Sequence, residues 1–285
     1  MTDPRWGGAR IVRQGVRAAR EAAERLREAL GRHGSSTLLP PCDLRDVGPG
    51  DFEEIGREFL GHMICLASLQ PPESVLEIGC GPGRMALPLS TYLSDKGRYV
   101  GVDVVAKAVA WCRRNISRRH PNFAFHHADV LNQRYNPGGK FEARTYTFPF
   151  SDHSFDFILL TSVFTHLYPA DTQHYLQDIA RMLRPTGRVL ATFFLLNPEQ
   201  RALAEQGQNH IDFRFERGGF RVRDDALPES AVAVEEQATR RMLEDAGLMI
   251  QEPIRFGSWS GRDGGLSFQD IVLTMPANQT SAGRQ

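Results

Sequence analysis

The feature that most constrains this chain is a short apolar run that breaks into three glycines, Val75-Leu76-Glu77-Ile78-Gly79-Cys80-Gly81-Pro82-Gly83-Arg84. Branched apolar residues such as Val75, Leu76 and Ile78 are typical of a strand buried in a parallel sheet. The glycines remove side chains where the backbone must turn sharply, and they let a ligand approach the free N–H groups that open the next helix. The stretch therefore predicts a strand, a tight loop and a helix, and the open question is whether the loop binds a ligand.

The glycine spacing separates two kinds of nucleoside cofactor. A dinucleotide-binding loop follows G-x-G-x-x-G, which after Gly79 and Gly81 requires a third glycine at position 84. That position is Arg84, and the third glycine is Gly83. The pattern Glu-x-Gly-x-Gly-x-Gly resembles instead motif I of the class I S-adenosylmethionine (SAM) methyltransferases. For the loop alone, a tight turn without a ligand remains the alternative.

This resemblance implies a SAM site and a seven-stranded fold of the Rossmann-like type. The acidic residue that opens the motif, Glu77, is associated in the family with the methionine end of the cofactor. The remaining cofactor contacts that we expect from this loop are Gly79, Cys80, Gly81, Gly83 and Arg84.

Two further acidic residues follow predicted strands. An acidic residue about 20 positions after the glycines, at the end of the second strand, can accept hydrogen bonds from both ribose hydroxyls. Asp103 fits this role, with capping of the next helix as the alternative, and Val104 would then lie against the adenine. After the third strand, the position of Asp129 matches the family residue that contacts the adenine amino group, and Val130 is expected beside it.

The end of the fourth strand, Ser154–Thr161, is where a methyl acceptor meets the cofactor in this fold, and we assign Thr161 and Ser162 to the cofactor side. The stretch lacks the Asn/Asp-Pro-Pro-Tyr, Pro-Cys and strand-end Asp signatures of the adenine, cytosine-5 and magnesium-dependent catechol methyltransferases. Its sequence from Ser162 to Leu167 resembles a bacterial subgroup that is often associated with glycan or secondary-metabolite clusters. These observations favour a small-molecule acceptor.

His166 is the candidate catalytic residue of this stretch. Methylation of an alcohol requires a base, and imidazole titrates near neutrality. A structural role at the start of the next helix is the alternative for His166. An amine or thiolate acceptor needs no base, because holding acceptor and methyl group in line is sufficient.

The order of predicted elements is two helices, then alternating strands and helices, then two final strands. This order predicts a doubly wound, mostly parallel seven-stranded sheet with an antiparallel last strand. An apolar stripe over Val12–Leu30 predicts a peripheral helix, a lid or a dimer contact within an N-terminal helical extension over residues 1–70. The SAM-binding domain is expected over 71–275, with an acceptor cap inserted after strand five at 197–234 and a disordered tail at 276–285.

Composition narrows the remaining possibilities. The formal net charge is zero, so no basic excess indicates a nucleic-acid or membrane partner. Four scattered cysteines without a C-x-x-C pattern suit a reducing cytoplasm, and no apolar run is long enough for a signal core or a membrane span. His126 and His127 are adjacent on a strand and point to opposite faces, so we expect no metal site.

The sequence thus predicts a cytoplasmic SAM-dependent methyltransferase of the EC 2.1.1 type, which forms S-adenosylhomocysteine (SAH) as its product. The expected acceptor is a hydroxyl of a sugar or secondary metabolite, and a homodimer is possible. N-methylation, other SAM chemistry in the same fold, and a catalytically silent SAM-binding scaffold are the alternatives. The intact set Glu77, Asp103, Asp129 and three glycines disfavours the scaffold.

Overall fold

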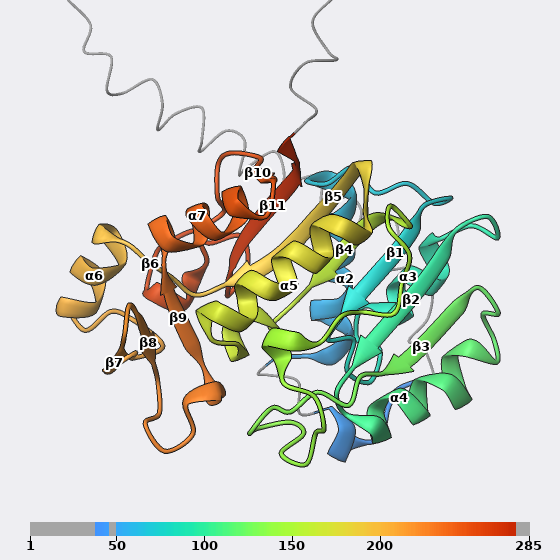
Figure 1. Ribbon diagram of the computed structural model, residues 1–285, viewed down its shortest axis with the longest axis horizontal. Helices are drawn as coiled ribbons and strands as arrows, with labels where there is room; N and C mark the ends of the chain where they lie inside the picture. The colour runs from blue at the N-terminus through green and yellow to red at the C-terminus, as the bar shows by residue number, and fades with distance from the viewer. Residues whose placement is uncertain (1–37, 46–49, 278–285) are drawn as a thin grey trace, which may run out of the picture.

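The computed structural model describes residues 38–45 and 50–277 (Figure 1). The predicted stripe from Val12 to Leu30 lies outside the described residues, and so do residues 278–285 of the predicted tail. No helix in the described part of the chain combines the length and apolar character that a membrane crossing requires.

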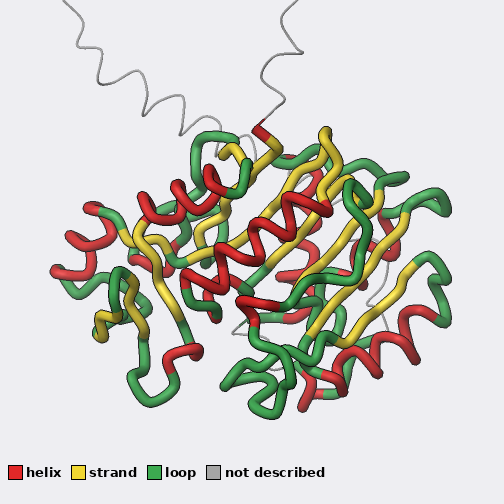
Figure 2. The backbone as a smooth tube through the Cα atoms, viewed as in Figure 1, coloured by secondary structure: helices red, strands yellow, loops and turns green. Residues whose placement is uncertain are grey.

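A twisted sheet of seven strands forms the centre of the molecule (Figure 2). Its spatial order is β10-β11-β5-β4-β1-β2-β3, and β11 runs antiparallel to both of its neighbours while β1 to β5 pair in parallel. The doubly wound sheet with an antiparallel last strand is therefore confirmed. The bounds are β1 Ser74–Ile78, β2 Arg98–Asp103, β3 Phe123–His127, β4 Phe155–Leu160, β5 Leu183–Phe193, β10 Leu248–Ile250 and β11 Asp270–Pro276.

Helices cover both faces of the sheet, because successive strand residues point to opposite sides. Val75 packs into a core with α2 (Phe52–Cys65), α3 (Ala86–Tyr92) and α4 (Ala106–Cys112). Leu76, the next residue, packs into a second core with α5 (Pro169–Met182) and α7 (Glu236–Asp245). Helix α2, which the sequence groups with the N-terminal extension, is thus part of the central packing.

Short helical turns connect several of these elements. Asp51 caps the start of α2, because its side chain accepts hydrogen bonds from the N–H groups of Glu53 and Glu54. The turns are η1 Cys42–Leu44, the π-helical η2 Arg113–Ser117, η3 Ala143–Thr145, η4 Phe164–His166, η5 Pro228–Ser230 and η6 Ser258–Ser260.

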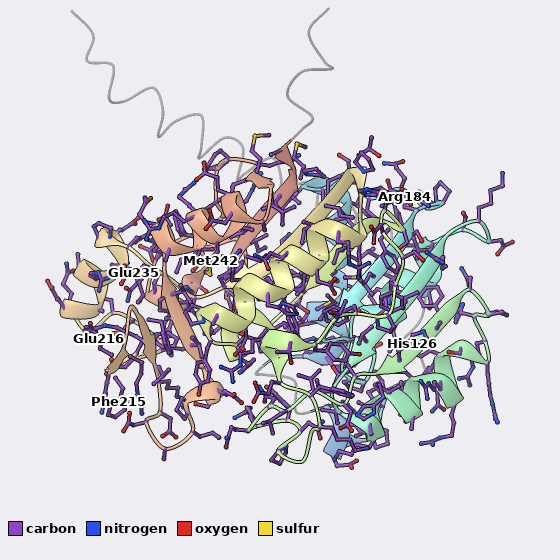
Figure 3. The ribbon with its side chains drawn as sticks, viewed as in Figure 1. His126, Arg184, Phe215, Glu216, Glu235 and Met242 are labelled. Atoms are coloured by element: carbon purple, nitrogen blue, oxygen red, sulfur yellow. The ribbon has the colours of Figure 1, made fainter. Side chains whose placement is uncertain are left out.

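The long connection after β5 folds into a second, smaller sheet. It contains α6 (Pro198–Glu205) and four strands in the order β6-β9-β8-β7, with Phe215 and Glu216 on the edge strand β7 (Figure 3). The strands are β6 Leu195–Leu196, β7 Phe215–Arg217, β8 Phe220–Val222 and β9 Val232–Glu235. A small core of its own joins this sheet to η6, formed by Phe194, Leu196, Phe213, Ala231, Ala233 and Trp259.

Asp270 fixes the second sheet to the main one. Its buried carboxylate accepts hydrogen bonds from the N–H groups of Leu195 and Gly257 at 2.7 Å and from the indole N–H of Trp259 at 2.9 Å. Burial raises the pKa of Asp270 to about 6 despite these donors.

Candidate functional site

One cavity of about 630 Å³ lies at the carboxyl ends of β1, β2 and β4, where open α/β sheets bind their ligands. It extends from the glycine loop to η4 and to Leu227 of the second sheet's connection. Its lining includes most of the predicted site residues, namely Glu77, Gly79, Cys80, Gly81, Arg84, Asp103, Val104, Val130, Thr161, Ser162 and His166. Gly83 and Asp129 do not line it.

The glycine loop passes very close to the segment that follows β4. Gly79 has φ +79°, and a β-carbon built on it would lie 2.4 Å from Cγ2 of Val163. The N–H groups of Gly79 and Cys80 both donate to the carbonyl of Val102. Position 79 therefore requires glycine for both its backbone angle and its packing.

Asp103 is buried at the end of β2 and shapes the same loop. Its Oδ2 accepts a hydrogen bond from the N–H of Gly81 at 2.6 Å, and its Oδ1 accepts one from Val105 at 2.7 Å. Burial raises its pKa, against these two donors. A carboxylate offers about four lone-pair positions, so capacity remains on each oxygen for a bound ligand.

Glu77 lies deeper, with 1% of its surface exposed. The hydroxyl of Tyr99, on the neighbouring strand, donates a hydrogen bond to Oε2 of Glu77. Burial raises the pKa of Glu77 to about 8, although Tyr99 and the charge of Arg84 act in the opposite direction. Tyr99 is not recognisable as a site residue from the sequence, where it is one aromatic residue within an apolar strand.

Two predicted cofactor residues face elsewhere. A β-carbon on Gly83 would meet Cδ1 of Ile116 at 2.6 Å, so this glycine permits packing against the turn after α4. Asp129 accepts a hydrogen bond from Asn136 at 3.3 Å and pairs with Lys140 at 3.4 Å. The turn that carries Asn136 and Lys140 therefore binds the Asp129 carboxylate, which does not line the cavity.

The chain turns abruptly after β4. Ser162 has φ +57°, in the left-handed region that non-glycine residues seldom adopt. Its N–H donates to Oγ1 of Thr192 at 2.8 Å, and its hydroxyl donates to Oε1 of Gln269 at 3.0 Å. Neighbouring strands therefore hold this turn, which leads directly to η4.

His166 is the last residue of η4, and its side chain contacts Tyr135 and Glu229 from two other segments of the chain. Its Nδ1 lies 2.8 Å from the carbonyl oxygen of Glu229, and since a carbonyl only accepts, Nδ1 carries the proton. Its Nε2 then carries no proton and accepts a hydrogen bond from the hydroxyl of Tyr135 at 3.4 Å. Burial lowers the pKa of His166 to about 4, so the ring is neutral near pH 7.

The partners of His166 come from segments to which the sequence analysis gave no site residue. Asn132 accepts hydrogen bonds from the N–H groups of Arg134 and Tyr135 through Oδ1 and donates to the carbonyl of His166 through Nδ2. Tyr135 packs edge-on against the imidazole, with 5.2 Å between ring centroids. An Asn whose side chain bonds the backbone two and three residues later is a turn signal that could have indicated this loop.

The connection between β8 and β9 closes the end of the cavity that His166 lines. Leu227 lines the cavity, and the carboxylate of Glu229 accepts a hydrogen bond from the N–H of Gln133 at 2.5 Å. The predicted cap segment, residues 197–234, therefore contributes both a wall and the carbonyl that orients His166.

In the described ranges, no group of three or more His, Cys, Asp or Glu side chains is placed to hold a metal ion. His126 on β3 packs against the ring of Phe150 (Figure 3). His127 instead lies 3.1 Å from the carbonyl of Val104 through Nε2.

Comparison with known proteins identifies the domain. A family model described as a methyltransferase domain matches residues 75–187. An uncharacterized methyltransferase, YcgJ, of Bacillus subtilis is 29% identical over 210 residues, which are 73% of this chain and 72% of that protein. An uncharacterized 37.1 kDa protein in transposon TN4556 of Streptomyces fradiae is 28% identical over 175 residues, 61% of this chain.

The similarity to other relatives is partial. The chain spans only 46% of the length of the transposon protein. The tRNA N(3)-cytidine methyltransferase METTL2 of Gallus gallus is 30% identical over 118 residues, which are 41% of this chain and 29% of that protein. These matches support a common domain.

The fold also has a counterpart among solved structures. The PH0226 protein from Pyrococcus horikoshii superposes with a TM-score of 0.56 at 15% identity, covering 82% of this chain and 94% of that one. The matched residues include the glycine loop at the end of β1 and the acidic residue Asp103 at the end of β2. Residues 75–187 therefore form a methyltransferase domain, and the chain is similar over 73% of its length to an uncharacterized methyltransferase.

Proposed function

We propose that the protein transfers the methyl group of SAM to a hydroxyl group of a small molecule. The observation that carries this proposal is the geometry at His166. Its neutral ring holds an unprotonated Nε2 in the same cavity as the glycine loop. A proton-accepting atom so placed suits an acceptor that must lose a proton on methylation.

The cavity fits SAM at both ends. Glu77 and Arg84 line it beside the glycine loop, where a carboxyl and a guanidinium group can pair with the amino and carboxylate groups of a methionine moiety. Asp103 retains lone pairs for the ribose hydroxyls. A volume of about 630 Å³ lies within the usual range of cofactor sites and leaves room for part of an acceptor.

SAM supplies a methyl carbon that is already electrophilic, so the residues of this chain need only orient the acceptor and receive its proton. The hydroxyl proton becomes strongly acidic as the oxygen gains the methyl group, and a base with a pKa near 4 is then sufficient. Glu229 holds the imidazole in the required tautomer. Tyr135, Leu167 and Leu227 enclose the reacting region and exclude water.

A small acceptor is favoured over a nucleic acid. The chain has a formal net charge of zero, whereas binding of a polyanion relies on many basic contacts. The resemblance of the sequence from Ser162 to Leu167 to a bacterial subgroup associated with glycan or secondary-metabolite clusters supports a sugar or secondary metabolite as the acceptor. We further propose a cytoplasmic location, which suits four free cysteines, and a SAM-binding domain over 71–275 with 197–234 as its acceptor cap.

The decisive experiment is methyl transfer from SAM labelled with ¹³C at the methyl group. The protein is incubated with the small-molecule fraction of its host and, separately, with the host's RNA. We expect label in a small molecule, with the ¹³C shift of an O-methyl group. Label in RNA or an N-methyl shift would overturn the acceptor assignment, and His166→Asn is the control that retains a donor to Glu229 but has no basic nitrogen.

A further inference from the structure

Tyr99 and Glu77 form a hydrogen-bonded pair in the interior of the protein, on adjacent strands. They are 0% and 1% exposed, and the phenol donates to Oε2 of the carboxylate. The Tyr99 ring is held in place because it stacks on Phe123, with 4.8 Å between centroids, and packs against Phe125. The carboxylate of Glu77 also lines the cavity. Tyr99 therefore acts on the cavity through Glu77.

The register of the sheet makes this contact possible. Val75 pairs with Tyr99 and Glu77 pairs with Gly101, so Tyr99 and Glu77 are diagonal neighbours on one face. Gly101 has no side chain to intervene, and a β-carbon there would lie 2.8 Å from Cδ1 of Phe125. The space beside Glu77 is thus left to the phenol.

Several other groups influence Glu77. Arg84, in the turn before α3, favours its ionised form, whereas Asp103 at the end of β2 disfavours it. Glu58 of α2 acts on Arg84, and the thiols of Cys80 and Cys112 of α4 are buried nearby and neutral. Burial outweighs these charges and raises the pKa of Glu77 to about 8, so at pH 7 the carboxyl holds a proton.

We propose that Tyr99 is a positioning residue for Glu77, and that binding of SAM releases the proton that Glu77 holds. The proton passes to solvent when the ammonium group of the cofactor takes its place beside the carboxylate. Tyr99 assists because its hydrogen bond stabilises the ionised carboxylate that the ammonium needs. The inference rests on the assignment of the methionine end of SAM to Glu77 in the proposed function.

Calorimetry tests the proton release without any turnover. SAH, which carries the same ammonium group, is titrated at pH 7 into the full chain in phosphate and in Tris, whose heats of ionisation differ. The dependence of the observed enthalpy on the buffer gives the protons released. We expect close to one proton per site for the unmodified protein and close to none for Glu77→Gln.

Tyr99→Phe separates positioning from a merely structural role. In the unmodified protein, affinity for SAH should rise between pH 6 and pH 8. Removing the proton from Glu77 costs free energy at low pH, and this cost falls as the pH approaches the pKa of Glu77. Tyr99→Phe should bind about tenfold more weakly at pH 7, with the rise moved to higher pH. Tyr92→Phe is the matched control, because it removes a phenol that donates to the carbonyl of Leu69 away from the cavity.

The outcomes distinguish the inference from the proposed function. Binding of SAH without proton release, or Tyr99→Phe with an unchanged affinity and pH profile, would overturn the inference alone. An equal loss at every pH would show Tyr99 to be structural and would also overturn it. Failure of the unmodified protein to bind SAM or SAH would instead overturn the proposed function.

Discussion

The carboxylate of Asp103 and the N–H of Gly81 are joined by a hydrogen bond of 2.6 Å, so the end of β2 holds the middle of the glycine loop. The same carboxylate is our candidate for the ribose hydroxyls. Loop shape and cofactor binding therefore depend on one side chain.

Replacement of Asp103 should weaken both SAM and SAH. Loss of charge-assisted hydrogen bonds costs about 1.5–3 kcal/mol, so we expect Asp103→Ala to lower affinity by roughly tenfold to more than a hundredfold. Asp103→Asn keeps one acceptor oxygen, so its affinity for SAM and SAH should lie between those of the unmodified protein and Asp103→Ala. Calorimetry measures this, with the exposed Asp212→Ala as control, and unchanged affinity of Asp103→Ala would exclude Asp103 from the site.

His166→Ala should lower kcat for a hydroxyl acceptor by on the order of 10²–10⁴ and leave SAM affinity within about a few-fold. Because the pKa of His166 is about 4, the ring is neutral from pH 6 to pH 9, and kcat should lose its base only as the pH falls toward 4. Steady-state rates across this range provide the measurement. Full turnover by His166→Ala between pH 6 and pH 9 would show that another group, or proximity alone, serves the reaction.

Gly79→Ala should reduce SAM affinity by more than about tenfold. The new methyl group would combine a left-handed backbone, which costs about 1–2 kcal/mol, with a collision against Val163. Gly207→Ala isolates the backbone cost, since Gly207 has φ +68° and nothing within 4 Å of an added β-carbon. Comparable SAM affinities for the two variants would show that the contact with Val163 is unimportant.

Asp270→Ala should destabilise the protein by about 3 kcal/mol or more, because three buried donors lose their acceptor. The folded-state pKa of about 6 lies above the unfolded value of about 3.9, so protonation favours the folded state. The extra stability that protonation of Asp270 gives is thus complete below about pH 4 and is lost as the pH rises through 6, whereas the three hydrogen bonds to its side chain remain. Urea unfolding from pH 4 to pH 7 tests this, and a variant as stable as the parent would refute it.

Activity should not depend on a divalent metal, as expected from the lack of a ligand cluster in the described ranges. Turnover is to be compared before and after dialysis against EDTA. Recovery of a lost activity on adding magnesium would be the contrary result.

The meeting of Glu77 and Asp103 in one cavity could be predicted because both residues lie at the carboxyl ends of strands. Glu77 and Asp103 each stand where an apolar run breaks, and parallel strands bring such ends to one edge. Asp129 also follows a strand, but the Asn136–Lys140 turn, which the sequence does not relate to it, engages its carboxylate.

The surroundings of His166 could not be predicted, because the residues that contact it meet only in the folded chain. Tyr135 and Glu229 come from two irregular segments and converge on His166. Strands β7 and β8 have three residues each, which is too short to show the alternation of apolar and polar residues that identifies a strand. The second sheet was therefore not predicted.

Turn residues also do not reveal where every strand begins. The Pro185-Thr186-Gly187 stretch lies within β5, where an irregular register against β4 between Phe155 and Phe157 accommodates it.

The position of β11 sets an order of events during synthesis. It lies between β5 and β10, although both are made before it. Until β11 has been synthesised, one edge of β5 remains unpaired and the donors that Asp270 serves have no acceptor. An unpaired strand edge can pair with other chains, so the arrival of β11 is the step that removes this risk of aggregation.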